Sequence, residues 1–160
     1  MSDLTTFYPI QTWKDNKILR TKSQNITSID KDIKDFTDDL MDLMYEYDWV
    51  WLAAPQIWKN IRIIATTTRK ETKKWSELVD EEIMINPVIV EKSQEIVTSE
   101  EACLSVPDVI WNVKRHKSIT VEYLDTNGFK KKKKLKNYNA FIVQHEIDHL
   151  DAILFIDKLI

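Results

Sequence analysis

The stretch 144–149, with the sequence QHEIDH, constrains this chain more than any other segment. A His-Glu-x-x-His pattern is useful for metal binding only as a helix, because residues four apart then lie on one helix face. In that form His145 and His149 bind one divalent cation, and Glu146 acts on a water beside the ion without being a ligand. The sequence therefore predicts a helix with two metal ligands and leaves the third ligand to be found.

Length and charge allow one globular domain over residues 1–160. A chain of 160 residues buries about 70% of the surface that it exposes when unfolded. The formal net charge of −3 gives no reason to expect DNA or membrane binding, and no apolar run of about 18 residues predicts a transmembrane helix. Residues 1–4 lack the features of a secretory signal, and the single cysteine suits a reducing compartment. We therefore expect a cytoplasmic protein, in the host cytoplasm if a phage encodes it.

The chain has a single glycine, Gly128. Average usage of about 7% would supply roughly eleven. Turns with positive φ usually rely on glycine, so here we expect asparagine and aspartate to take these positions.

Hydrophobic spacing predicts an α+β order of elements. Apolar residues recur at steps of three and four between Ile29 and Tyr47, which predicts an amphipathic helix, and residues 27–30 fit a capping box before it. A second helix is expected to start near Asn137 or Asn139 and to carry the histidine pair. Several β-type segments lie between these helices: 62–66, 83–90, 94–98, the alternating Ile119, Val121 and Tyr123, and a hairpin turn at 127–128.

The third metal ligand is best supplied by Cys103. Zinc peptidases of one kind use a His six residues past the second His, where this chain has Phe155, and another kind uses a downstream Glu that is lacking here. Asp151, Asp157 and His116 remain as alternatives, but His116 lies in a basic segment typical of a solvated surface. Cys103 follows a β-type run and precedes a turn, and a thiolate with two imidazoles leaves one coordination position open for water.

Three segments resemble the signature motifs of the peptide deformylase family: WVWLAAPQ at 49–56, EACLS at 101–105 and QHEIDHL at 144–150. The similarity extends from residues 15–20 to residues 154–157. The resemblance implies the peptide deformylase fold, with antiparallel β-sheets surrounding the metal-binding helix. It also implies an enzyme that removes the N-formyl group from the formyl-methionine of nascent polypeptides and releases formate.

The resemblance also implies a role for each matching residue. Cys103, His145 and His149 correspond to the ligands of one divalent metal ion, which is Fe²⁺ in many members and Zn²⁺, Ni²⁺ or Co²⁺ in others. Glu146 corresponds to the general base and acid, and the oxyanion donors are Gln56 and the backbone N–H of Leu104. The expected substrate contacts are Trp49, Val50, Trp51, Leu52, Glu101 and Ala102. The expected partners are N-formylated nascent peptides, bound by a monomer.

The chain departs from the family pattern where glycines are usual. Trp49 and Trp51 replace both glycines of the first motif, while Ala102, Asn137 and Ala152 replace others. Two tryptophans at i and i+2 of an extended segment project from the same face. They either line and narrow the substrate channel or pack into the core, so altered N-acyl selectivity and a silent binding protein are the alternative functions. The complete set of candidate catalytic residues argues against the silent alternative.

The C-terminal part and a lysine run bear on ribosome contact. Only residues 150–160 follow His149, so we expect a short form without the C-terminal helix that docks many members on the ribosome. Lys130 to Lys134 either contacts ribosomal RNA or forms a solvated hairpin arm whose charges discourage edge pairing. The second interpretation is favoured.

Overall fold

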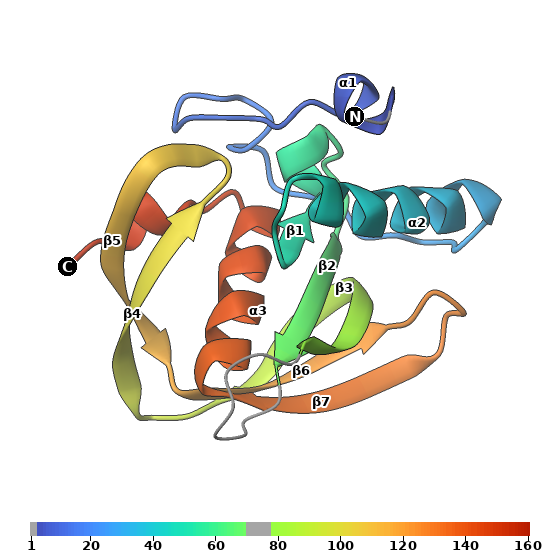
Figure 1. Cartoon of the computed structure of the whole chain (residues 1–160). Coiled ribbons are helices and arrows are strands. Elements are labelled where there is room, and N and C mark those ends of the chain that lie inside the picture. The colour runs from blue at the N-terminus through green and yellow to red at the C-terminus, as the bar shows by residue number, and fades with distance from the viewer. Residues whose placement is uncertain (1–2, 70–77) are drawn as a thin grey trace.

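The computed structural model describes residues 3–69 and 78–160 (Figure 1). Residues 1 and 2, part of the segment used above to exclude a secretory signal, lie outside the described residues. The helices are α1 (Asp3–Phe7), α2 (Lys31–Glu46) and α3 (Asn137–Leu150), with 3₁₀ turns η1 (Ala54–Ile57) and η2 (Phe155–Lys158). The strands are β1 (Trp51–Ala53), β2 (Ile63–Arg69), β3 (Leu78–Lys92), β4 (Ile96–Cys103), β5 (Val106–His116), β6 (Ser118–Leu124) and β7 (Lys130–Lys136).

The strands form two antiparallel sheets with α3 between them. One sheet has five strands in the order β1-β2-β3-β6-β7, and the other has only β4 and β5. Figure 1 shows α3 in the centre, between the β4–β5 pair and the larger sheet. The predicted α+β fold, with the His-Glu-x-x-His helix at its centre, is thus confirmed. None of the described helices is long and apolar enough to cross a membrane.

The side chains of β2 alternate between the two faces of the large sheet, and each face is covered by a helix. Ile63 and Ala65 pack on α2 in one buried cluster, while Ile64 packs on α3 in another. The side chains of the neighbouring strand β1 alternate in the same way: Leu52 packs in the α2 cluster and Ala53 in the α3 cluster. The side chains of β1 at odd positions therefore face the layer that holds the histidine pair.

Strand β1 is an edge strand with open polar groups beside α3. The N–H of Thr67 donates to the carbonyl of Val50 (2.9 Å), so in this antiparallel register the N–H and C=O of Trp51 point away from β2. Among the described strands, none pairs with this edge of β1. An extended peptide can therefore add to the sheet at Trp51.

Both helices start close to the predicted positions, but their caps differ from the prediction. The cap of α2 is Asp30, whose carboxylate accepts from the N–H of Ile33 (3.0 Å), so the helix starts after the predicted capping box and not at Thr27. Helix α3 starts at Asn137 with Lys136 as N-cap and no side-chain cap. Asn139 instead bonds to the backbone of Arg69, because strand and helix meet there.

Strand β5 was not predicted, and its amino-acid pattern explains why. It belongs to a two-stranded sheet, and its exposed apolar residues interrupt the alternation that marks a half-buried strand. The neighbouring β4 was predicted only as 94–98, but it continues to Cys103. The predicted strand-to-turn position of that cysteine is therefore confirmed.

Positive φ values occur at residues other than glycine, as the composition predicts. Asp48, Asn86, Asp108 and Asn137 adopt them, but so do Trp13, Trp58 and Ala152. Asparagine and aspartate tolerate this region, whereas alanine and tryptophan are strained there. The single glycine, Gly128, also has positive φ, in the predicted turn between β6 and β7.

Ala152→Gly is expected to stabilise the protein by about 0.5–1 kcal/mol. Ala152 follows the C-cap of α3 with φ of 63°, and the N–H of Ile153 bonds back to the carbonyl of Asp148 (2.9 Å), which is the helix-ending motif that favours glycine. Relief of about 1–2 kcal/mol of left-handed strain exceeds the entropy gained by the unfolded chain. Denaturant unfolding measures the change, and Ala140→Gly inside α3 should destabilise. No stabilisation by Ala152→Gly would contradict the expected strain.

Candidate metal centre

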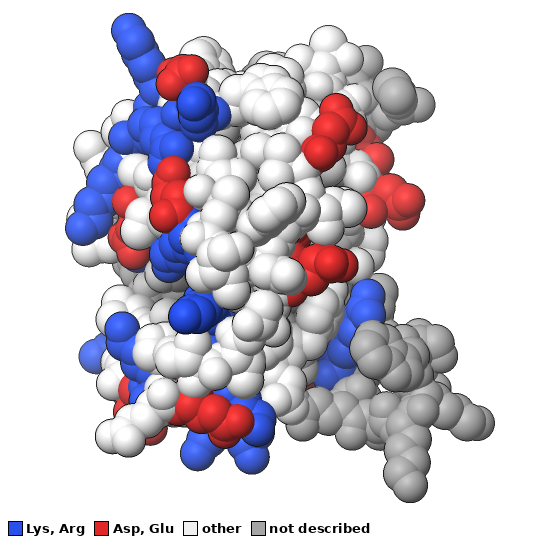
Figure 2. Space-filling view, turned by 90° about the vertical axis from the view of Figure 1, so that its left-hand side faces the viewer, with Lys and Arg blue, Asp and Glu red and all other residues white. Residues whose placement is uncertain are grey.

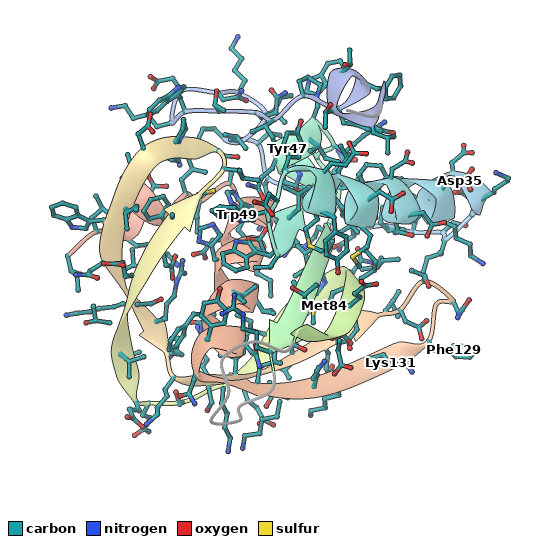
Figure 3. All side chains as sticks on the ribbon, in the orientation of Figure 1. Asp35, Tyr47, Trp49, Met84, Phe129 and Lys131 are labelled. Atoms are coloured by element: carbon teal, nitrogen blue, oxygen red, sulfur yellow. The ribbon has the colours of Figure 1, made fainter. Side chains whose placement is uncertain are left out.

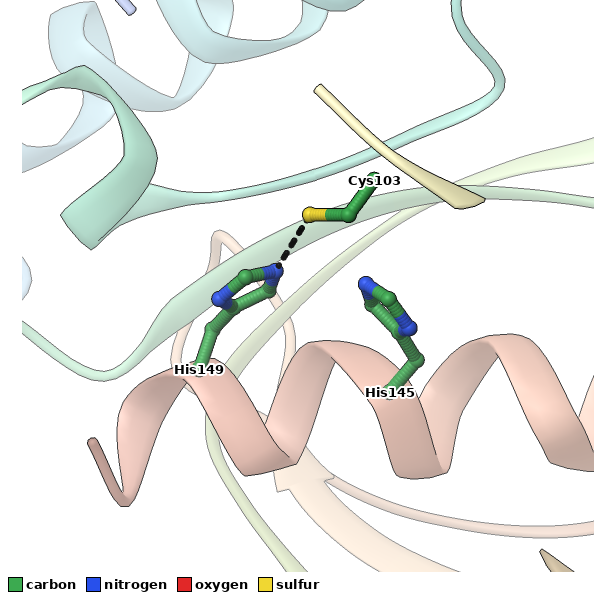
Figure 4. Close-up of side chains that lie close together, drawn as sticks. All are labelled: Cys103, His145 and His149. Carbon is green, nitrogen blue, oxygen red and sulfur yellow. Dashed lines mark hydrogen bonds between the residues drawn. The ribbon is translucent and has the colours of Figure 1, made fainter. Parts of the chain in front are cut away.

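Three buried side chains converge between α3 and the end of β4. His145 and His149 project from one face of α3, and Cys103 reaches them from the last position of β4 (Figure 4). One ligand atom from each residue lies within 4.8 Å of the others, and Cys103 Sγ is 3.3 Å from His149 Nε2. Of the candidates for the third ligand, the structure thus brings Cys103 to the histidine pair.

The donor set and its spacing fit one divalent ion. Usual metal–sulfur and metal–nitrogen bonds in a tetrahedral site place the sulfur and nitrogen about 3.5 Å apart, close to the 3.3 Å between Cys103 and His149. His145 Nε2 is buried and has no hydrogen-bond partner among the described residues. A nitrogen left without a partner beside a thiol is what a metal ligand requires, so the residues fit a metal ion.

A buried chain of charges orients His145. Its Nδ1 lies 2.9 Å from Glu101 Oε2, which leaves Nε2 for the metal. Arg115 donates to both carboxylate oxygens of Glu101 (2.8 Å each) and to Asp148 Oδ2 (2.5 Å), and Lys158 donates to Asp148. Burial alone would raise the pKa of Glu101, but hydrogen bonds from Arg115 and His145 hold this pKa at about 2. Glu101 is therefore a fixed anion behind the metal ligand.

In the absence of a cation, the groups at the centre of the site favour their neutral forms. Burial, together with the charge of Glu146, raises the pKa of the Cys103 thiol to about 12. Burial and nearby positive groups lower the pKa of His149, while burial and the charge of Glu101 raise the pKa of Glu146. A bound divalent cation favours the thiolate form of Cys103 instead, so metal binding releases the proton of this thiol.

Glu146 and Gln56 lie beside the metal ligands without belonging to the cluster. Glu146 is 0% exposed, and neither of its carboxylate oxygens has a hydrogen-bond partner among the described residues. Gln56 is held in the 3₁₀ turn η1, where its Oε1 accepts from the N–H of Ala53 (2.9 Å). Its Nε2 donates to Ser105 Oγ (3.2 Å) and faces Cys103 Sγ (3.6 Å). Glu146 Oε1 lies 3.9 Å from His145 Nε2, too far for a hydrogen bond. The site thus has a carboxylate without a hydrogen bond and a fixed amide donor.

An apolar pocket of about 260 Å³ opens beside His145. Its walls include Trp49 and Trp51 from the β1 segment and Glu101 and Ala102 from β4. Val50 and Leu52 do not line it: Leu52 is buried in the α2 cluster, and the carbonyl of Val50 bonds to β2. The two tryptophans therefore line the pocket, and they are not core residues.

Several other sequence-based interpretations are changed by the structure. Arg115 lies in a segment interpreted as a solvated basic surface, yet its side chain is only 2% exposed because it faces inward with Val113. Asp151 and Asp157 pair with Arg62 and Arg20 and so are not part of the cluster. His116 is half-buried, with Nδ1 2.7 Å from the carbonyl of Ser93. Leu104 is partly buried against the α2 cluster, directly after Cys103.

The site combines a histidine pair on a helix, a buried thiol and a buried carboxylate without a hydrogen bond, and a pocket adjoins them. This combination is that of a metal-dependent hydrolase. The family model for polypeptide deformylase matches residues 7–160. A peptide deformylase of Pseudothermotoga lettingae is 39% identical over 142 residues, which cover 89% of this chain and 77% of the relative.

Two crystal structures of peptide deformylases are similar over nearly the whole chain. The one from Thermotoga maritima has a TM-score of 0.86 and 32% identity, covering 96% of this chain and 98% of that one. The one from Acinetobacter baumannii, bound to Met-Ala-Ser, has a TM-score of 0.87 and 30% identity, covering 95% and 98%. The chain belongs to the peptide deformylase family. Its reaction is the metal-dependent removal of the N-formyl group from nascent polypeptides.

Proposed function

We propose that Cys103, His145 and His149 hold the metal ion of this deformylase and that Glu146 carries the proton of the reaction. The observation that supports this assignment most strongly is the buried cluster at the end of the pocket, next to a carboxylate with no hydrogen-bond partner among the described residues. We further propose Fe²⁺ as the ion, with Zn²⁺, Ni²⁺ or Co²⁺ able to take its place, because thiolate and imidazole suit each of them. When bound, the ion supplies Lewis acidity and lowers the pKa of a water that it coordinates.

Glu146 accepts a proton from the attacking water and returns it to the leaving amine. A general acid–base group works best when its pKa lies near the pH of the reaction. Burial raises the pKa of Glu146 in that direction, and the absence of other partners among the described residues leaves both oxygens available. This one carboxyl group serves both steps, so no second acid is required.

The formyl oxygen gains negative charge as water attacks, and Gln56 stabilises that charge. Its amide is fixed by Ala53 on one side and Ser105 on the other, so the donor needs no reorganisation during the reaction. The backbone N–H of Leu104, which follows Cys103 in the turn after β4, is the second proposed donor. Loss of one such donor typically lowers the rate by about 10²–10³.

The substrate backbone adds to the open edge of β1. The N–H and C=O of Trp51 point outward there, next to the pocket beside His145. A peptide that pairs with Trp51 as an extra strand presents alternate side chains to opposite faces. The side chain of the first residue then enters the pocket, and the formyl group lies at the metal ligands.

The lysines of β7 are better explained as protection of a sheet edge than as an RNA contact. Lys131, Lys132 and Lys133 pair with acidic residues of neighbouring strands or turns. Lysines on an edge strand discourage pairing with other chains. Figure 2 shows basic residues interspersed with acidic ones along one side of the β4–β5 face, and an uncharged area across its middle. We therefore propose a monomer that acts on nascent chains in the cytoplasm without a lasting ribosome contact.

Formate release from formyl-Met-Ala-Ser tests the proposal. Protein purified without oxygen and loaded with Fe²⁺ should release formate at a rate typical of enzymes, with one ion per chain by metal analysis. Acetyl-Met-Ala-Ser serves as the control and should be cleaved far more slowly. Preference for the acetyl peptide, or no turnover by fully loaded protein, would contradict the proposed function.

A further inference from the structure

Three aromatic rings form one continuous wall of the pocket, which we call the aromatic wall: Trp49, Trp51 and Tyr138. The rings of Trp49 and Trp51 meet edge to face, with centroids 5.5 Å apart. The ring of Trp51 meets that of Tyr138 in the same way at 5.8 Å. Figure 3 shows Trp49 projecting into the space between β1 and the β4–β5 pair. Trp51 is therefore held between two other rings.

The far end of the aromatic wall is fixed to the large sheet. The guanidinium of Arg69 lies 4.8 Å from the centroid of the Tyr138 ring. The side chain of Asn139 makes two hydrogen bonds to the backbone of Arg69: it accepts from the N–H of Arg69 (3.0 Å) and donates to the carbonyl of Arg69 (2.9 Å). These bonds connect the end of β2 to the start of α3, so the wall cannot move aside without disturbing both elements.

Beside the aromatic wall, much of the described pocket surface is apolar, formed by Ala102, Ile110, Phe141 and Ile142. Its polar lining residues are His145, Ser99, the exposed Glu100, and Glu101, whose carboxylate is already occupied by Arg115 and His145. A cavity of about 150 Å³ already admits benzene, so the 260 Å³ here do not exclude bulky side chains by size alone. The rings cover one side of the pocket, so their chemistry acts directly on the first side chain.

We propose that the aromatic wall recognises the sulfur of the first methionine and that Trp51 is the specificity-determining residue. Thioether sulfur is polarisable and makes favourable contacts with aromatic rings at about 5 Å. Among the described residues, four aromatic side chains line this pocket, the three rings of the wall and Phe141, so a sulfur inside it meets a ring in several orientations. This inference rests on the proposed function, because it places the first side chain of the substrate in the pocket.

Norleucine provides the decisive comparison, because it replaces the sulfur by a methylene of nearly the same shape. The wild-type protein should favour formyl-Met-Ala-Ser over formyl-norleucine-Ala-Ser by about two- to tenfold in kcat/KM, the range that sulfur–aromatic contacts allow. The products Met-Ala-Ser and norleucine-Ala-Ser should differ by a similar factor in Kd, measured by calorimetry. Without recognition of sulfur, the more apolar norleucine should bind equally well or better.

Three variants locate the effect. Trp51→Leu and Tyr138→Leu should each bring the methionine-to-norleucine ratio close to one. Trp111→Leu, at an exposed tryptophan of β5 outside the pocket, should leave the ratio unchanged. A wild-type ratio of one, or an unchanged ratio in Trp51→Leu, would overturn the inference. Product binding keeps the two proposals apart, because a sulfur preference in Kd without formate release would contradict the proposed function alone.

Discussion

Replacement of Glu146 by glutamine is expected to lower kcat/KM for formyl-Met peptides by about 10²–10⁴ while the metal stays bound. Glutamine has nearly the same shape, so the fully buried position is filled without a cavity. It cannot accept the proton of the attacking water, and no other described carboxylate has buried oxygens without a hydrogen-bond partner. Glu146→Ala should lose activity to a similar degree and also retain the ion, because Glu146 is not part of the ligand cluster.

Metal content and folding must be measured on the same samples. The expected result is one ion per chain and an unchanged circular dichroism spectrum in both variants. Glu122→Gln, at an exposed position of β6 that pairs with Lys132, is the matched control and should keep full activity. Activity above about one tenth of wild type in the metal-loaded Glu146→Gln protein would rule out Glu146 as the proton carrier.

The convergence of the candidate metal ligands was predictable because local spacing determines most of their geometry. A His-Glu-x-x-His segment that forms a helix must place His145 and His149 on one face. Cys103 was predicted as the third ligand by eliminating the other candidates and by its place at the end of a β-type segment. In the structure it ends β4 and lies beside the two histidines. The fold class was also predictable, since the spacing of apolar residues changes from the helical to the strand period between α2 and β2.

The sequence did not reveal what orients those ligands, because that depends on contacts between distant segments. Glu101 and Arg115 meet only because β4 and β5 pair as a hairpin, and Asp148 joins them when α3 docks. In sequence, Arg115 lies among basic residues and resembles a surface position. The one signal for the burial of Arg115 is its position two residues after the apolar Val113, which places both side chains on the same face of a strand. This signal becomes informative only once β5 is recognised as a strand.

The tryptophans illustrate a different limit. Their spacing predicts that Trp49 and Trp51 share a face, but it does not say which layer that face meets. The layer is decided by the neighbours of Trp51 along β1, since Ala53 packs on α3 and Leu52 on α2. Tertiary docking thus placed the rings in the pocket, and this could not be derived from the local pattern.

Arg115→Met is expected to destabilise the protein by about 3–5 kcal/mol and to weaken metal binding about 10–100-fold. Methionine fills the space, but it leaves the buried Glu101 without its bidentate partner and Asp148 with only Lys158. Glu101 then holds His145 Nδ1 less firmly, so the ligand loses its fixed orientation. Denaturant unfolding measures the first effect, and competition with a metal chelator measures the second.

Lys117→Met is the control, because Lys117 pairs with Glu95 at positions where both side chains are about half exposed. Such exposed pairs typically contribute less than about 1 kcal/mol, and neither residue belongs to the cluster of Cys103, His145 and His149. Equal losses in the two variants would show that Arg115 has no special role.

Arg115→Lys separates the charge of this residue from its geometry. Lysine keeps a positive charge near Glu101 and Asp148, so much of the stability should return relative to Arg115→Met. Its ammonium cannot donate to both oxygens of Glu101 and reach Asp148 in the planar arrangement of a guanidinium. Metal affinity should therefore remain low while stability recovers. If both recover together, Arg115 acts as a buried charge alone, and the orientation of His145 does not depend on its fork-like hydrogen bonds.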